Sequence, residues 1–131
     1  MKSAILSLIL PLILAGTTDL DEVSIVYLAP GSSEYLEISS NPTTGYSWVV
    51  NSYTSDFFTI EDGGYIPDDT GDRVLSGSGG TQVFIVYANS TCVEGDNIQI
   101  EFLYVRSWET YPAYSKEVTF YATNDYTLLN M

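Results

Sequence analysis

The residues with catalytic potential are few, because the sequence contains no histidine and a single cysteine, Cys92. Without histidine, neither a Ser-His-Asp triad nor a Cys-His pair can form, and most zinc and haem sites lose their usual ligand. A thiolate at Cys92 would lack an activating base, so we expect a buried apolar filler or a free thiol. The sequence therefore argues against an enzyme and predicts no cofactor and no bound metal.

Carboxylates are the remaining candidates for chemistry. Five of them gather between two strand-like segments, at Glu61, Asp62, Asp68, Asp69 and Asp72. Their spacing does not fit an EF-hand calcium loop, which needs ligands at alternate positions and a glutamate at position twelve. A two-carboxylate glycosidase would need a larger cleft than one small domain offers. A solvated, turn-rich loop explains the cluster best.

The first unusual segment spans residues 41–48 and reads Asn-Pro-Thr-Thr-Gly-Tyr-Ser-Trp. Pro42 fixes its own φ, and its ring pushes Asn41 into an extended conformation. Gly45 can adopt a positive φ or let another backbone approach closely. An ordinary turn with Trp48 as the core tryptophan of a sandwich accounts for Trp48. It accounts less well for eight stiff, specific residues on a connection that could be two.

The second segment, residues 77–80, reads Gly-Ser-Gly-Gly and leads into a strand-like run that carries Phe84. A loop almost without side chains can lie with its backbone against a partner and offer main-chain hydrogen bonds. Composition alone favours simple flexibility instead.

The third segment, residues 106–109, reads Arg-Ser-Trp-Glu and follows a strand-like run that ends at Tyr104. Tryptophan and arginine at a loop tip are the side chains most often found as interface hot spots. In the alternative, Trp108 folds back over the end of the domain and Arg106 pairs with Glu109. The segment alone does not separate these two interpretations.

The rest of the chain alternates with a period of two residues, which is typical of strands. Such runs cover residues 23–27, 35–38, 48–50, 57–60, 81–87, 98–104 and 117–121. Turn signals separate them, for example at Asp62-Gly63-Gly64. This pattern predicts an all-β, immunoglobulin-like antiparallel β-sandwich of about seven to eight strands, in which the three unusual segments emerge at the same end.

The three segments, in this order and spacing, resemble the chagasin family of cysteine protease inhibitors. The family pattern combines an Asn-Pro-Thr-Thr-Gly-aromatic-x-Trp loop, a Gly-x-Gly-Gly loop before an aromatic-bearing strand, and an Arg-Pro-Trp loop. Here the first matches throughout, the second matches at its glycines, and the third has Ser107 in place of the central proline. The resemblance covers residues 41 to 112, most of the expected domain.

The resemblance implies a reversible, tight-binding inhibitor of papain-like cysteine proteases, with cathepsin L-like enzymes as partners. It places the first segment at the catalytic cysteine and histidine of the protease, the second along the unprimed subsites and the third on the primed side. The protease-binding residues that it implies are Asn41, Pro42, Thr43, Thr44, Gly45, Tyr46, Gly77, Ser78, Gly79, Gly80, Arg106, Ser107 and Trp108. The alternative is a non-inhibitory secreted immunoglobulin-like module for adhesion or recognition that uses the same pole.

The N-terminus predicts export. Lys2 precedes a short apolar run that ends in small residues, so we expect a signal peptide over residues 1–16 and one domain over 17–131. The domain would then be secreted or held in lysosome-like vesicles, with an N-glycosylation sequon at Asn89. Its 17 acidic residues against three remaining basic ones argue against nucleic-acid or membrane binding, and we expect a monomer.

Overall fold

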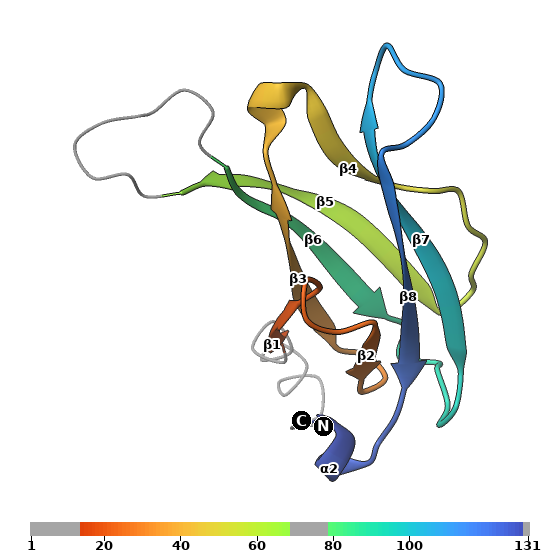
Figure 1. Cartoon of the computed structure of the whole chain (residues 1–131). Helices are drawn as coiled ribbons and strands as arrows, with labels where there is room; N and C mark the ends of the chain where they lie inside the picture. Colours follow the sequence, from red (N-terminus) through yellow and green to blue (C-terminus); the bar gives the residue numbers. More distant parts are fainter. Residues whose placement is uncertain (1–13, 69–78, 130–131) are drawn as a thin grey trace.

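A computed structural model describes residues 14–68 and 79–129 of the chain, which form a two-layer β-sandwich (Figure 1). One sheet has the strand order β1-β3-β6-β5 and the other the order β2-β8-β7-β4. The strands are β1 (Leu14–Asp19), β2 (Ile25–Leu28), β3 (Ser33–Ser40), β4 (Tyr46–Val50), β5 (Phe58–Pro67), β6 (Gly80–Ala88), β7 (Asn97–Arg106) and β8 (Tyr114–Ala122). The prediction of an all-β sandwich of seven to eight strands is confirmed.

Helical structure is limited to two short pieces in the described part of the chain. These are the 3₁₀ turn η2 (Pro42–Thr44) and the helix α2 (Tyr126–Leu129). Within residues 14–68 and 79–129, no helix has the length and hydropathy that a membrane span requires.

The core forms because every second residue of the long strands faces the other sheet. In β7 the inward positions hold Ile100 and Phe102, and in β6 they hold Phe84 and Val86, all of them buried. The rings of Phe84 and Phe102 meet edge to face across the sandwich, with centroids 5.2 Å apart. Burial of one such side chain contributes about 1.5–3 kcal/mol, so these few residues supply much of the stability of a domain without disulfides.

One inward position holds a carboxylate. Glu34 of β3 is buried and accepts a hydrogen bond of 2.5 Å from the Thr18 hydroxyl of β1. Burial raises the pKa of the Glu34 carboxyl above its usual value. This contact ties β1 to β3.

Two features of the sheets differ from the sequence-based expectation. The alternating pattern did not predict β1, which pairs in parallel with β3, and β2 pairs in parallel with β8, whereas the other four pairs are antiparallel. β5 does not turn at Asp62-Gly63-Gly64 but continues to Pro67. A bulge at this point places Asp62 opposite Phe84 and Gly64 opposite Val83, and Gly64 absorbs it with a φ of 101°.

The strand register brings three connections to one end of the sandwich, as expected. Ser40 at the end of β3 and Pro67 at the end of β5 both lie opposite Gly80 at the start of β6. In the other sheet, Tyr46 at the start of β4 lies opposite Arg106 at the end of β7. We call residues 41–45, 68–79 and 107–113 the first, second and third loops, and this end of the sandwich the loop pole (Figure 1).

Candidate functional site

The first loop is a preformed turn. The Thr44 amide donates to the Asn41 carbonyl (3.2 Å), and the Gly45 amide donates to the Pro42 carbonyl (2.9 Å). Gly45 has a φ of 87°, a left-handed conformation that favours glycine. The hydroxyls of Thr43 and Thr44 bond back to the Asn41 side chain and carbonyl at 2.5 and 2.7 Å. Pro42, Thr43 and Thr44 are exposed, so the loop presents a stiff tip to solvent.

Both ends of the first loop are held by aromatic side chains. The Asn41 amide donates to the Tyr104 hydroxyl (2.9 Å), and the Trp48 indole donates to the Ser39 carbonyl (2.9 Å). Trp48 also packs against the core and lies against the Tyr104 ring, with centroids 4.8 Å apart. The tryptophan therefore serves the core, as an ordinary sandwich requires, and closes the first loop as well.

Gln82 fixes the first loop relative to the second, and the sequence did not single this residue out. Its side-chain oxygen accepts from the Trp48 amide (2.9 Å), and its nitrogen donates to the Trp48 carbonyl (2.7 Å). β4 is an edge strand, so one side of its backbone has no neighbouring strand, and Gln82 supplies both missing partners. Its side chain is 7% exposed. The sequence signal for this role of Gln82 was a single glutamine within the largely apolar run 81–87.

The second loop is described only at its two ends. Gly77 and Ser78, both candidate contact residues, lie outside the described residues. Gly79 is partly exposed, and its carbonyl accepts from the Asp68 amide (3.1 Å), which closes the base of the loop. A Cβ on Gly79 would lie 3.3 Å from the Ser40 carbonyl oxygen, so the base of this loop runs close to the start of the first.

Gly80 is buried rather than presented to solvent. Its backbone belongs to β6, between Ser40 of β3 and Pro67 of β5. A Cβ at this position would overlap the Ile66 carbonyl oxygen and the Tyr65 hydroxyl. The structure thus places this candidate contact residue where it positions the second loop.

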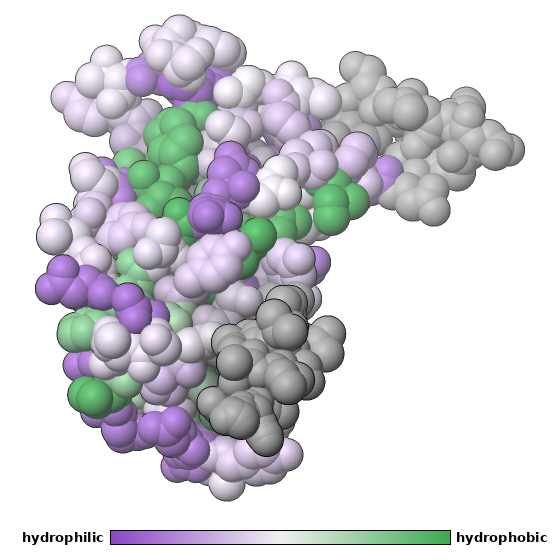
Figure 2. Space-filling model, turned by 180° about the vertical axis from the view of Figure 1, so that it is seen from behind, coloured by the Kyte–Doolittle hydropathy of each residue, from purple (hydrophilic) through white to green (hydrophobic). Residues whose placement is uncertain are grey.

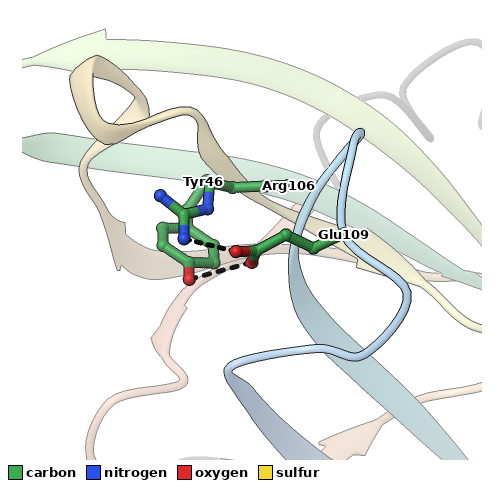
Figure 3. A network of polar contacts seen from close by, with 3 residues as sticks. All are labelled: Tyr46, Arg106 and Glu109. Atoms are coloured by element: carbon green, nitrogen blue, oxygen red, sulfur yellow. Dashed lines mark hydrogen bonds and ion pairs between the residues drawn. The ribbon is translucent and has the colours of Figure 1, made fainter.

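The third loop turns tightly on an ionic contact. The Glu109 amide donates to the Arg106 carbonyl (3.0 Å), and the Arg106 guanidinium donates to the Glu109 carboxylate at 2.5 Å. The Tyr46 hydroxyl donates to the other carboxylate oxygen at 3.2 Å, and the guanidinium lies over the Tyr46 ring, 4.3 Å from its centroid (Figure 3). The bond from Arg106 holds the pKa of Glu109 below its usual value.

Trp108 links the third loop to the first while remaining 68% exposed. Its ring lies against Gly45, where a Cβ would overlap it, and 5.4 Å from the Arg106 guanidinium. Both interpretations of this segment hold in part, because Arg106 does pair with Glu109 whereas Trp108 stays at the surface beside the first loop.

The first and third loops and the described ends of the second thus share one end of the molecule. The first and third are in direct contact, and the base of the second borders the start of the first. The large exposed side chains at this end are Trp108, Tyr111 and Tyr114. In the view from behind, the top of the molecule is white to purple, and green patches lie below it and at the lower left (Figure 2). Such a face, with exposed apolar groups on rigid supports and no described catalytic pair, suits binding to another protein.

This geometry defines a β-sandwich that presents a three-loop binding face. The model of the chagasin family of peptidase inhibitors, family I42, matches residues 27–123. Chagasin from Trypanosoma cruzi is 30% identical in an alignment of 95 residues that covers 69% of this chain and 78% of chagasin. The chain belongs to the chagasin family, and the expected inhibition of cysteine proteases is confirmed.

Solved structures agree on the fold. The cysteine protease inhibitor EhICP2 from Entamoeba histolytica superposes with a TM-score of 0.59 at 19% identity, over 82% of this chain and 96% of its own. The solution structure of amebosin gives a TM-score of 0.57 at 26% identity, over 82% and 95%. PbICP-C, solved in complex with falcipain-2, gives a TM-score of 0.57 at 13% identity, over 82% and 98%.

Replacing Gln82 with leucine should destabilise the domain by about 1–3 kcal/mol, because the Trp48 amide and carbonyl lose their partners. Urea unfolding measures this change. Gln99 is exposed on β7 and makes no such contact, so Gln99→Leu is the matched control and should change stability by less than about 0.5 kcal/mol. Equal effects of the two substitutions would contradict the role assigned to Gln82.

Proposed function

We propose that the chain inhibits papain-like cysteine proteases reversibly, as a monomer, by inserting the loop pole into the active-site cleft. Cathepsin L-like enzymes are the proposed targets. The observation that carries this proposal is the contact of the first and third loops around Gly45 and Trp108, beside the base of the second. The structural relative PbICP-C, solved in complex with falcipain-2, supports this class of partner.

Rigidity is the physical basis of tight binding. The loop pole is ordered by hydrogen bonds within the first loop and by the Arg106–Glu109 contact in the third. Side chains and backbone that are already ordered lose less conformational entropy on binding. A three-loop contact can reach the usual inhibitor interface of roughly 1,600 Å².

The proposed roles follow from exposure. Thr43 and Thr44 form the tip and would meet the catalytic cysteine and histidine, where a turn closed by its own hydrogen bonds offers no peptide in attack geometry. Gly79 would contribute main-chain hydrogen bonds on the unprimed side. The exposed ring of Trp108, held by Arg106, would pack on the primed side as a hot spot.

Replacing Thr44 with aspartate should raise the inhibition constant for papain by about 100-fold or more, because it places a carboxylate beside the catalytic thiolate. Titration of papain with the wild-type and variant domains, using a fluorogenic peptide, measures this effect. Thr54 is exposed on the β4–β5 connection at the opposite end, so Thr54→Asp is the charge-matched control and should inhibit like the wild type.

Two outcomes of this titration would contradict the proposal. Undiminished inhibition by Thr44→Asp would refute the placement of the first loop. No inhibition by the wild-type domain at micromolar concentration would favour the alternative, a non-inhibitory recognition module.

Replacing Ser107 with proline should slow dissociation from papain about threefold. Ser107 occupies the second position of the turn closed by the Glu109 amide, a position that proline favours, and Arg106 before it is in an extended strand. The proline would stiffen the third loop without new contacts. Surface plasmon resonance separates the two rate constants, and Ser107→Ala serves as the control. An unchanged dissociation rate for Ser107→Pro would remove the stiffness argument.

We propose further that the domain enters the secretory pathway and carries a glycan at Asn89. This residue is exposed on the β6–β7 connection, and its side-chain oxygen accepts from the Thr91 amide and hydroxyl at 2.9 and 3.0 Å. Because β6 starts at the loop pole and ends at Ala88, Asn89 lies at the opposite end of the sandwich. A glycan there would leave the loop pole free.

Expression of the full chain in eukaryotic cells should yield secreted protein whose mass falls on treatment with peptide-N-glycosidase F. Asn89→Gln should abolish this shift, and both forms should inhibit papain equally. An unglycosylated wild-type protein would contradict the modification, and weaker inhibition by the glycosylated form would contradict its placement.

A further inference from the structure

An open pocket of about 420 Å³ lies at the loop pole, between the ends of the two sheets. One wall comes from the end of β3 and Asn41, and from the start of β6 with the two described ends of the second loop, Asp68 and Gly79. The other wall comes from the aromatic residues of β4, β7 and β8. The lining residues that matter here are Ser40, Trp48, Asp68, Gly79, Tyr104 and Tyr114. The exposed threonines of the tip do not line the pocket, which therefore borders the first loop at Asn41 rather than at the residues proposed to meet the catalytic centre.

The aromatic wall of the pocket continues the row of inward-facing residues that forms the core. Trp48, Tyr104 and Tyr114 lie side by side on three adjacent strands, with Tyr104 opposite both of the others. Ring centroids are 4.8 Å apart for Trp48 and Tyr104, and 6.1 Å for Tyr104 and Tyr114. Tyr104 continues the inward positions of Ile100 and Phe102. These rings therefore sit where core residues would, although the core has ended, and Tyr114 is 67% exposed.

The opposite wall of the pocket holds polar groups that can accept hydrogen bonds from a bound ligand. Ser40 is 6% exposed and lines the pocket, and its hydroxyl has no hydrogen-bond partner among the described residues. A buried hydroxyl without a partner is costly, and a donor that reached it from the pocket would remove that cost. Asp68 adds a carboxylate at the rim. Its charge contributes, after burial, to the raised pKa of the nearby Tyr65 hydroxyl.

A cationic occupant uses both walls and is favoured by their charge. An anion would meet the Asp68 carboxylate, and an aliphatic side chain would leave Ser40 and Asp68 unmatched. A guanidinium stacks on aromatic rings, offers five donors and is attracted by a net charge of −13. The structure thus favours arginine over lysine, because a planar group fits between a ring wall and a polar wall.

We propose that this pocket receives an arginine side chain from the rim of the target protease and so selects among papain-like enzymes. This inference rests on the proposed function. It adds Ser40, Asp68, Tyr104 and Tyr114 to the recognition surface, none of which the three sequence motifs contain.

The test is an NMR titration of the ¹⁵N-labelled domain with N-acetyl-arginine amide, and with N-acetyl-norleucine amide as the neutral control. We expect millimolar binding of the arginine compound, with shifts confined to the Trp48 indole and the amides of Gly79 and Tyr114. Norleucine should bind about fivefold more weakly or not at all.

Substitutions in the pocket sharpen the test. Asp68→Asn and Tyr114→Ala should each weaken arginine binding about fivefold. The matched controls are Asp56→Asn, on the β4–β5 connection at the opposite end, and Tyr111→Ala, an exposed tyrosine of the third loop outside the pocket. Both controls should bind like the wild type.

The other outcomes of these experiments would contradict the proposed arginine pocket. No shifts, or equal shifts with norleucine, would overturn the proposal while leaving papain inhibition as a separate result. Arg73 lies outside the described residues. Stronger arginine binding in Arg73→Ala would overturn the proposal, because it would show that an arginine of this chain competes for the pocket. Arginine binding without any inhibition of papain would remove the protease as the partner, together with the proposed function.

Discussion

The two hydrogen bonds between the Gln82 side chain and the Trp48 backbone are the contact on which the loop pole depends. They join the edge strand of one sheet to a central strand of the other. Trp48 lies three residues after the first loop, and Gln82 lies three residues after the second. A sandwich held only by apolar packing would allow the sheets to slide, because packing is not directional. The paired amide contact fixes the position of one loop against the other.

The third loop is aligned by a different device. Its link to the first is aromatic and ionic, through the guanidinium that lies over Tyr46 and bonds to Glu109. In isolation an exposed ion pair stabilises a fold little. Here the carboxylate also accepts from the Tyr46 hydroxyl, so the contact fixes geometry through a network (Figure 3). Gly45 is required at the junction because the Trp108 ring occupies the space of a side chain.

Much of this arrangement follows from sequence because the strongest local signals lie in the loops and long strands. Proline at position 42 and glycine at position 45 constrain the backbone wherever they occur, and the alternation of Ile98, Ile100 and Phe102 with polar residues predicts which face of β7 is buried. The strand β1 could not be predicted, because Leu14–Asp19 does not alternate in sequence. Its pairing with β3 depends on tertiary structure rather than on a local pattern. The same holds for the bulge at Gly64, where pairing with β6 overrides an apparent turn.

Side chains that act across the two sheets were the ones that sequence could not place. Gln82 interrupts an apolar run in the sequence. Its hydrogen-bond partner, the Trp48 backbone of the edge strand β4, is visible only in the structure. Tyr104 lies within a predicted strand, whereas Tyr114 precedes the run 117–121 that the sequence predicted, and nothing in their spacing shows that the core ends beneath them. Local pattern determines which face a residue occupies, whereas the ends of the partner sheet determine whether that face is core or binding surface.

Charge distribution connects these observations. Among residues 16–68 and 79–129, the basic side chains are Arg106 and Lys116, against 15 acidic ones. Arg106 is neutralised locally by Glu109, so the loop pole carries no free guanidinium of its own in the described residues. A protein of this charge attracts basic surfaces over about a Debye length and repels acidic ones. The rigid tip is therefore open to any cleft of matching shape, while the acidic body favours a target whose rim is basic.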